Sequence, residues 1–411
     1  MVTASGTGAA GRRGWAGRVV AHAATLALPG EAVATGARGW PGTLRSARLP
    51  GADTSIGAQV STPSTPPTAG PAGLDLAAVT PWLRARAGVE PPLTASTVAG
   101  GRSNLTYIVT DARGHRVVVR RPPLHGVLES AHDVAREHRI LTALADTEVP
   151  VPRCLGLEED EALLGAPFYA MEYVEGVVAR DSHTAATELQ PAARAASGPA
   201  LIDVLVRLHS VDVDAVGLGT LARRDGYLER QLKRWHGQLE RARTRDLPLL
   251  EEVHARLSAA VPTQGPATIV HGDYRLDNLL LDPVSGTVRA VLDWELTTLG
   301  DPLADLGLLL VYWAQPDDPT SPLPDAPTLA EGFATREELT ERYARASGRD
   351  VSGVGYHVAF GYWKLACILE GVHSRYVSGA YGEGAEGFEQ LGELVIELGE
   401  RASDAAAEVG R

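Results

Sequence analysis

Strand-like hydrophobic runs come first in this chain of 411 residues, and helix-like periodicity follows. Apolar runs bounded by turn residues predict β-strands at residues 94–100, 105–110, 116–121, 153–157 and 168–174. Apolar residues at helical spacing predict two helices in the same region, at residues 74–87 and 130–146. We therefore expect residues 74–175 to form a small, mostly antiparallel β lobe with one helix between its strands.

Helical periodicity dominates after Gly176. It predicts helices at residues 199–210, 226–245, 248–260, 336–346, 356–377 and 388–407. Short apolar strands are expected at residues 268–270 with 279–281, and at residues 288–292. Strands first and helices afterwards predict an α+β chain whose second lobe, residues 176–411, is mostly helical.

Residues 1–73 differ from the rest in composition, since 50 of them are Ala, Gly, Pro, Ser or Thr. Six arginines against two acidic residues give this segment a net charge of +4. Such a composition predicts disorder. Two other interpretations stay open: an export signal beginning near Arg12 and Arg13, or a translated leader ahead of a later start codon.

Composition narrows the possible functions. A formal net charge of −13 argues against nucleic-acid phosphates as the main partner. No uncharged apolar run reaches the roughly 18 residues that a membrane span requires. Cys154 and Cys367 are far apart, which argues against a disulfide framework or a cysteine-based metal site. We therefore expect a cytoplasmic protein that binds neither nucleic acid nor membrane.

The strongest chemical signal is the run His-Gly-Asp-Tyr-Arg-Leu-Asp-Asn at residues 271–278. Asp273 and Asn278 lie five positions apart on an expected loop, and Asp293 ends the next hairpin strand. These three side chains can converge on one point. A carboxylate that orients a hydroxyl, together with oxygen ligands for a divalent cation, is the equipment of phosphoryl transfer.

This combination resembles the kinase-like phosphotransferases, the group of aminoglycoside and choline kinases that shares its fold with protein kinases. The resemblance extends from about residue 74 to the C-terminus and implies a two-lobed, protein-kinase-like fold that uses ATP and Mg²⁺. It implies that Asp273 orients the acceptor hydroxyl and takes its proton, and that Asn278 and Asp293 bind the metal. Oxygen donors on short loops suit Mg²⁺.

The expected β lobe offers candidates for binding the nucleotide. Gly100, Gly101, Ser103 and Asn104 join two strands, where glycine lets backbone N–H groups approach phosphate oxygens. A Gly-Gly turn can also be only a hairpin turn. Its position ahead of strand, strand and helix favours the phosphate-binding interpretation.

The resemblance places Arg120 where kinases carry a lysine that contacts phosphates, with Glu137 as its ion-pair partner. Arginine departs from the general kinase pattern, although its forked side chain can contact a phosphate and a carboxylate at once. Two alternatives stay open. Arg120 could project into solvent, and Arg121 would face inward if the strand register were shifted by one residue.

Residues 168–176 fit the hinge between the two lobes of a kinase. The resemblance implies that the carbonyl of Glu172 and the amide of Val174 hold adenine. Arg275 lies two residues after Asp273, where it would either neutralise the transferring phosphoryl group or pair with Asp277.

Other polar residues in the second lobe are interpreted as structural. Asp301 and Asp305 are expected to cap the following helix and to brace the loop at residues 271–278, which we call the catalytic loop. His209, His254 and His357 lie within helical patterns and have no partner at metal-ligand spacing, so we interpret them as surface or core residues.

The chain also resembles one branch of this superfamily, the kinase-like domain fused ahead of an acyl-CoA dehydrogenase domain in some animal enzymes. The resemblance rests on four runs, at residues 120–123, 130–137, 271–278 and 360–376. It implies a hydroxyacyl-CoA or hydroxy acid as the acceptor, and a separate acyl-CoA dehydrogenase as a partner. An aminoglycoside-type antibiotic kinase and a nucleotide-binding scaffold without catalysis remain alternatives. Glu370 and Arg375 on the last run would line the acceptor cleft or pack in the core.

Overall fold

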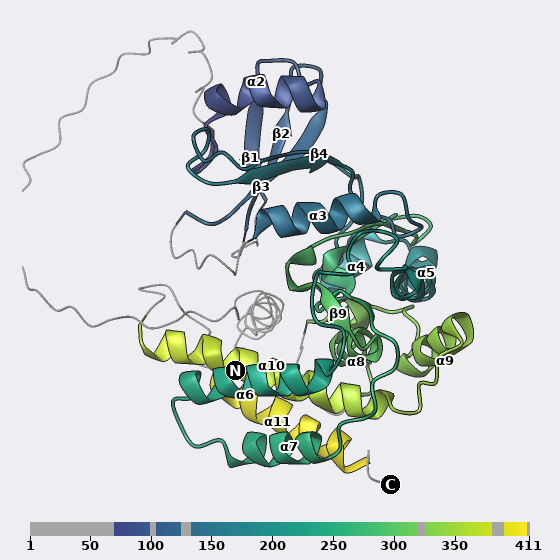
Figure 1. Ribbon diagram of the computed structural model, residues 1–411. Coiled ribbons are helices and arrows are strands. Elements are labelled where there is room, and N and C mark those ends of the chain that lie inside the picture. The colour runs from purple at the N-terminus through teal and green to yellow at the C-terminus, as the bar shows by residue number, and fades with distance from the viewer. Residues whose placement is uncertain (1–69, 99–103, 125–132, 319–324, 380–389, 409–411) are drawn as a thin grey trace, which may run out of the picture.

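The computed structural model describes residues 70–98, 104–124, 133–318, 325–379 and 390–408. The turn residues Gly100, Gly101 and Ser103 therefore lie outside the described residues, as does the compositionally distinct segment up to residue 69. Within the described residues, a β-rich part precedes a mostly helical part (Figure 1). This is the α+β arrangement that the order of strands and helices predicts.

The β-rich part is one five-stranded antiparallel sheet. Its strands run in the order β1-β2-β3-β5-β4. Their bounds are Thr94–Thr97 for β1, Leu105–Thr110 for β2, Arg116–Arg121 for β3, Cys154–Glu158 for β4 and Phe168–Glu172 for β5. Four of the five strands thus start at the predicted residue, and β4 starts one residue later than predicted.

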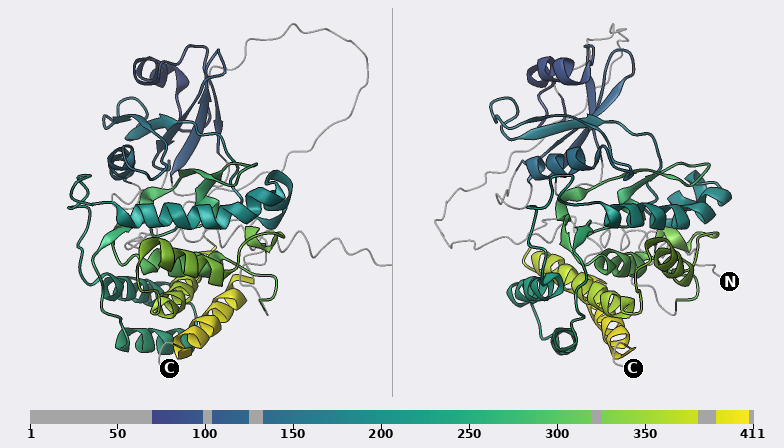
Figure 2. Two further views of the ribbon diagram at one scale, coloured as in Figure 1. Left: turned by 90° about the vertical axis from the view of Figure 1, so that its right-hand side faces the viewer. Right: turned by 45° about the vertical axis from the view of Figure 1, so that its right-hand side comes forward.

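Two helices lie on opposite faces of this sheet, as Figure 2 shows from two directions. Val117 and Val119 of β3 pack with α2 (Leu76–Ala87), whereas Val118 packs with α3 (Val134–Leu144). Because side chains alternate along a strand, this register also sends Arg120 to the α3 face and Arg121 to the α2 face. The sheet thereby determines which arginine faces the helical part.

The helical part contains the following helices among the described residues: α4 (Ser182–Glu188), α5 (Pro191–Ser210), α6 (Tyr227–Ala242), α7 (Pro248–Ala259), α8 (Leu303–Tyr312), α9 (Arg336–Ser347), α10 (Val354–Val377) and α11 (Leu391–Glu408). Helix α10 is buried on most of its surface and packs against α6, α7, α8 and α11 (Figure 1). No helix in the described ranges has both the length and the apolar character needed to cross a membrane.

Helix α5 begins eight residues earlier than the sequence pattern predicts. Pro191 occupies its first turn, where a missing N–H costs nothing, and Pro199 lies inside the helix. The helix continues through Pro199 because Leu201, Leu205 and Leu208 bury one face of it in the core. Tertiary packing here outweighs the preference of proline for a helix start.

Two short two-stranded sheets flank the polar motif at residues 271–278. Strand β6 (Thr268–Val270) pairs with β9 (Thr298–Gly300), and β7 (Leu279–Leu281) pairs with β8 (Val288–Val291). Residues 268–270 and 279–281 are therefore not partners of each other, and β9 was not expected from the sequence. Strand β6 ends just before residues 271–278 and β7 begins just after them. The two strand pairs thereby bring this loop beside the segment that follows β8.

Candidate active site

Asp273 and Asn278 are buried and bound to each other. The amide nitrogen of Asn278 donates to Oδ2 of Asp273 at 2.9 Å and to the backbone carbonyl of Asp273 at 2.8 Å. Asp273 is only 2% exposed, and its second oxygen, Oδ1, has no hydrogen-bond partner within the described part of the chain. One carboxylate oxygen is thus held in place while the other is left for a ligand.

Asp293 is brought to the same place by backbone and imidazole contacts. The N–H of Leu292 donates to the carbonyl of Asn278 at 2.8 Å. His271 donates from Nε2 to the carbonyl of Leu292 at 3.0 Å, and its Nδ1 accepts from the N–H of Asp273 at 3.3 Å. These two bonds require the neutral tautomer that carries its proton on Nε2. His271 therefore links the loop of Asp273 to the segment of Asp293.

Asp293 also has an unusual backbone conformation. Its φ is 64°, and it is the only non-glycine residue with positive φ among those described. Side chains with a Cβ seldom adopt this conformation, and such residues concentrate at functional sites.

Asp305 braces the catalytic loop from below, as the sequence predicts. Its two carboxylate oxygens accept from the N–H groups of His271 at 2.7 Å and Gly272 at 2.8 Å. Burial alone would raise the pKa of Asp305, but the hydrogen bond and charge of His209 hold that pKa below its usual value. Asp305 lies within α8 and does not cap it, whereas Asp301 accepts from the N–H of Leu303 in its first turn.

Position 272, whose N–H is bound by Asp305, requires glycine. Its φ is 86°, and a Cβ at this position would lie 2.8 Å from the carbonyl oxygen of Leu296. On its other side, the ammonium group of Lys364 on α10 donates to the carbonyl of Gly272 at 3.1 Å. Burial lowers the pKa of Lys364 to about 8. No pattern in the sequence singles out Lys364, which lies 92 residues from Gly272 along the chain.

Arg120 faces the helical part and bridges two carboxylates. Its Nε lies 3.1 Å from Oε2 of Glu137 on α3, and its Nη2 donates to Oδ1 of Asp293 at 2.8 Å. Arg121 points to the other face of the sheet, where it donates to the carbonyls of Gly73 and Leu164. Of the two arginines, Arg120 is thus the one beside the catalytic loop, and the solvent-exposed alternative does not apply to it.

Glu295 is an acidic residue of this site to which the sequence analysis assigned no role. Both of its carboxylate oxygens are buried, and neither has a hydrogen-bond partner among the described residues. Burial first, and then the charge of Asp293, raise the pKa of Glu295 well above its usual value. Its position two residues after Asp293 is the signal that could have identified it.

Unpaired, buried oxygen atoms are what a divalent cation would satisfy. Asp273 and Glu295 supply such atoms, and Asn278 and Asp293 add further oxygen donors close by. Hard cations such as Mg²⁺ take oxygen ligands of this kind. The residues present therefore fit the metal that the resemblance implies.

The candidate hinge residues lie where the sheet meets the helical part. Glu172 ends β5, Val174 follows it, and Gly176 passes so close to the β7–β8 hairpin that a Cβ would lie 3.1 Å from Leu280. Asn104 at the start of β2 is buried, and its Oδ1 has no partner within the described ranges. Contacts to a nucleotide stay a prediction for these residues.

Comparison with known proteins identifies the family. The profile of a family described as "Phosphotransferase enzyme family" matches residues 94–350, which is more than half of the chain. The chain belongs to this family. Phosphotransferases of this family with kinase activity use ATP, and small-molecule kinases are among them.

Curated relatives of this phosphotransferase carry the names of acyl-CoA dehydrogenases. Acyl-CoA dehydrogenase family member 10 of Mus musculus is 37% identical over 313 residues, which is 75% of this chain and 29% of the relative. Family member 11 of Homo sapiens is 32% identical over 295 residues, 71% of this chain and 37% of the relative. The chain thus spans about a third of the length of these relatives.

Solved structures agree on the fold of this phosphotransferase. A protein of Ralstonia eutropha JMP134, described as an aminoglycoside phosphotransferase, matches with a TM-score of 0.69 and 31% identity, over 81% of this chain and 98% of that one. A macrolide 2′-phosphotransferase of Brachybacterium faecium matches with a TM-score of 0.51 and 22% identity, over 76% of this chain and 96% of that one. The second match is informative about the fold alone.

Arg275 of this phosphotransferase forms the ion pair with Asp277 that the sequence suggested, and a second ion pair with Asp273. Its guanidinium lies 3.4 Å from Asp277 and 3.2 Å from Asp273, and it stacks over the ring of Tyr312 at 4.7 Å. Arg275 and Asp277 also line a hollow beside the loop, together with Arg180. Arg275 therefore touches the carboxylate that would act on an acceptor.

Glu370 does not line the cleft. It is fully buried and accepts hydrogen bonds at 3.1 Å from the backbone and the hydroxyl of Thr244, in the turn between α6 and α7. Arg245 of the same turn approaches it at 3.4 Å. The core-packing alternative thus describes Glu370, while Lys364 is the residue of α10 that reaches the catalytic loop.

Proposed function

We propose that this phosphotransferase is an ATP- and Mg²⁺-dependent kinase that phosphorylates a hydroxyl group, with a hydroxyacyl-CoA or hydroxy acid as the favoured acceptor. The observation that carries the proposal is the hydrogen bond between the side chains of Asp273 and Asn278. Asp293 lies next to them because the N–H of the preceding residue, Leu292, donates to the carbonyl of Asn278. A carboxylate base and two oxygen ligands in one place are what phosphoryl transfer requires.

Asn278 and Asp293 would hold Mg²⁺, and Glu295, whose carboxylate interacts electrostatically with Asp293, is a third candidate oxygen donor. The cation supplies charge neutralisation for the phosphates and for the transferring group. The residues of the chain would fix the position of the cation and surround it with a buried environment, in which charge–charge interactions are stronger than in water.

Residues 74–175 would bind the nucleotide in this proposal, and residues 176–411 would bind the acceptor. Arg120 would contact the phosphates while Glu137 fixes its orientation, since the ion pair between them is already formed. The remaining nucleotide contacts are assigned to Gly100, Gly101, Ser103, Asn104, the carbonyl of Glu172 and the amide of Val174.

In the transfer step, Asp273 accepts the proton of the acceptor hydroxyl through Oδ1 while the hydroxyl oxygen attacks the γ-phosphorus and ADP leaves. Oδ2 cannot take this role as easily, because Asn278 and Arg275 already donate to it. Arg275 holds the carboxylate of Asp273 in place and would put positive charge beside the transferring group. The product is the phosphate ester of the acceptor.

The charge of the acceptor side supports an anionic substrate. Lys364 lies against the catalytic loop, where burial lowers its pKa, the charge of Asp273 raises that pKa, and the charge of Arg234 lowers it again. Cations on this wall oppose a polycationic aminoglycoside and favour a carboxylate or a CoA thioester. The names of the curated relatives point in the same direction, and a separate acyl-CoA dehydrogenase is the proposed partner.

The compartment in this proposal is the cytoplasm. Cys154 and Cys367 are both free thiols in the structure. Unpaired cysteines are typical of a reducing environment.

The test compares wild-type protein with Asp273→Asn, using ATP and a panel of hydroxyacyl-CoAs, free hydroxy acids, aminoglycosides and choline. Loss of a general base lowers turnover by about 10²- to 10⁴-fold, so we expect kcat of Asp273→Asn to fall in that range while the Kd for ATP stays within a few-fold. Asp212→Asn, an exposed aspartate on the loop after α5, is the control that keeps wild-type kcat.

Each outcome of the panel has a distinct meaning. Full activity in Asp273→Asn would refute its role as the base. Turnover of aminoglycosides alone would identify an antibiotic kinase, and ATP binding without transfer to any acceptor would identify a non-catalytic scaffold.

A further inference from the structure

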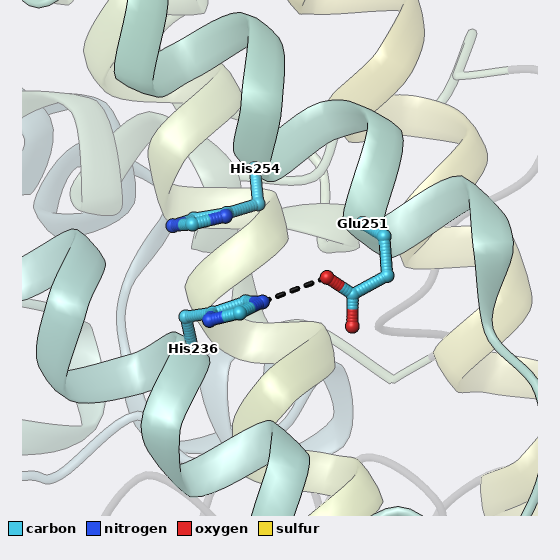
Figure 3. A group of neighbouring side chains, drawn as sticks. All are labelled: His236, Glu251 and His254. Atoms are coloured by element: carbon cyan, nitrogen blue, oxygen red, sulfur yellow. Dashed lines mark hydrogen bonds and ion pairs between the residues drawn. The ribbon is translucent and has the colours of Figure 1, made fainter.

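Two histidines and a glutamate meet on the surface of the helical part, on the pair of helices α6 and α7. His236 lies on α6, and Glu251 and His254 lie three positions apart on α7, so that all three side chains converge (Figure 3). One ligand atom from each residue lies within 4.8 Å of the other two. No other group of three such residues with this spacing occurs in the described ranges.

His254 was interpreted from the sequence as having no partner at ligand spacing, and the structure corrects this. Its first partner, Glu251, is at the i−3 position, which puts both on one face of α7. Its second partner, His236, is on a different helix, 18 residues earlier. A search for histidine or cysteine pairs along the sequence misses a site assembled in this way.

We propose that His236, Glu251 and His254 form a zinc site that ties α6 to α7, separate from the catalytic centre. Two imidazoles and one carboxylate, with the fourth position open to water, are a ligand set that Zn²⁺ uses in proteins. Mg²⁺ and Ca²⁺ prefer oxygen ligands only, so imidazole ligands select a transition metal. The catalytic centre, with oxygen donors from Asn278 and Asp293, selects the opposite class of cation.

The surroundings leave room for the metal and its water. A hollow of about 430 Å³ is lined by His236 and His254, and by the charged residues Glu229, Lys233 and Glu240; Glu251 lies beside it, in contact with His236. All three proposed ligands are half-buried, so solvent reaches them. The two carboxylates of the lining outnumber its one ammonium group, which favours a cation.

The proposed ligand atoms of His236 and Glu251 already face each other. Nε2 of His236 and Oε2 of Glu251 lie 2.7 Å apart, and Arg243 approaches only the other oxygen of Glu251, at 3.4 Å. Zinc would replace this hydrogen bond by two metal–ligand bonds, and the proton of the hydrogen bond would pass to solvent.

Binding requires a small rearrangement of the imidazoles. Their rings stack face to face with centroids 3.9 Å apart and an angle of 8°, so the ring nitrogens do not yet point at a common centre. Zinc–nitrogen bonds of about 2.0 Å require the ligand atoms to approach to roughly 3.3 Å. The half-buried His236 ring has to rotate for nitrogens of both imidazoles to reach one ion.

The test is a titration of the EDTA-treated, full-length protein with ZnCl₂ in millimolar MgCl₂, which occupies the catalytic centre. We expect one zinc per chain, and Co²⁺ in its place gives the visible absorption bands of a tetrahedral nitrogen-containing site. His236→Ala, Glu251→Gln and His254→Ala each weaken zinc binding by at least about ten-fold. His236→Cys, which keeps a zinc ligand, retains it.

Controls separate this site from other metal binding. His183→Ala removes an exposed histidine on α4 and leaves zinc binding unchanged. Circular dichroism of each variant without metal verifies that it is folded. Equal zinc binding in wild type, His236→Ala and Glu251→Gln, absence of binding to wild type, or loss of binding in Asp293→Asn overturns the proposal, the last because it places the zinc at the catalytic centre.

Discussion

Asp305 supports the catalytic loop through two charge-assisted hydrogen bonds, and Asp305→Asn tests how much the loop depends on them. Asparagine keeps the shape and one acceptor oxygen, but its NH₂ group faces the N–H of either His271 or Gly272. One buried donor then loses its acceptor, which costs about 1–3 kcal/mol, and the remaining bond loses the benefit of the charge. We expect the free energy of unfolding to fall by about 2–4 kcal/mol.

Urea unfolding followed by tryptophan fluorescence measures this change. The control is Asp212→Asn, because Asp212 also accepts from two backbone N–H groups, at 3.0 and 3.1 Å, but is exposed to solvent. Water replaces the lost acceptor there, so we expect a loss below about 1 kcal/mol. Equal losses in the two variants would refute the argument that burial gives Asp305 its importance.

The pH dependence of the Asp305→Asn effect follows from the lowered pKa of Asp305. A carboxylate whose pKa is lower in the folded state stabilises the protein above its unfolded pKa of about 3.9, and this contribution disappears as pH falls through the folded-state value. The difference between wild type and Asp305→Asn should thus be constant from pH 7 to about pH 5 and shrink below pH 4. The Asp305→Asn substitution should also lower kcat by about ten- to hundred-fold, because a loosened loop lets Asp273 shift from its position.

Two further predictions concern the loop and the nucleotide side. Gly272→Ala should destabilise the protein by at least about 2 kcal/mol more than Gly114→Ala in urea unfolding, because both glycines have positive φ but only Gly272 would collide with Leu296; similar losses would argue against the close contact. Arg120→Met should raise the KM for ATP at least about ten-fold, measured in an assay coupled to ADP release. Arg120→Lys should raise this KM by less than about ten-fold, because lysine keeps the positive charge. Unchanged KM in Arg120→Met would remove Arg120 from the nucleotide site, and a comparison with Glu137→Gln separates contact from orientation.

Local sequence was enough for the secondary structure of the β lobe. Strand β3 occupies the residues that the pattern predicts, because a run of β-branched residues next to a turn is a property of adjacent residues. The same holds for the helix at Arg336–Ser347, whose capping box lies within four consecutive positions. The boundary of α5 was predicted wrongly, since packing of distant side chains decides whether a proline ends a helix.

The composition of the active site was also accessible from the sequence, but its exact membership was not. Asp273, Asn278 and Asp293 carry a recognisable spacing, and the structure brings the three together through contacts at residues 271, 278 and 292. Lys364 carries no such signal. It reaches the loop only because α10 is buried beneath it, and no local pattern encodes the depth of a helix in the core.

The sequence by itself determined the order of strands and helices, the phosphotransferase motif and the two arginines that could contact a nucleotide. Tertiary structure decided that Arg120 faces Glu137 and Asp293, that the carboxylate of Glu295 is buried with no hydrogen-bond partner among the described residues, and that His236 meets Glu251 and His254. The reason is physical: periodicity and short motifs depend on residues near one another in the chain, whereas burial, ion pairs and ligand clusters depend on which elements pack together.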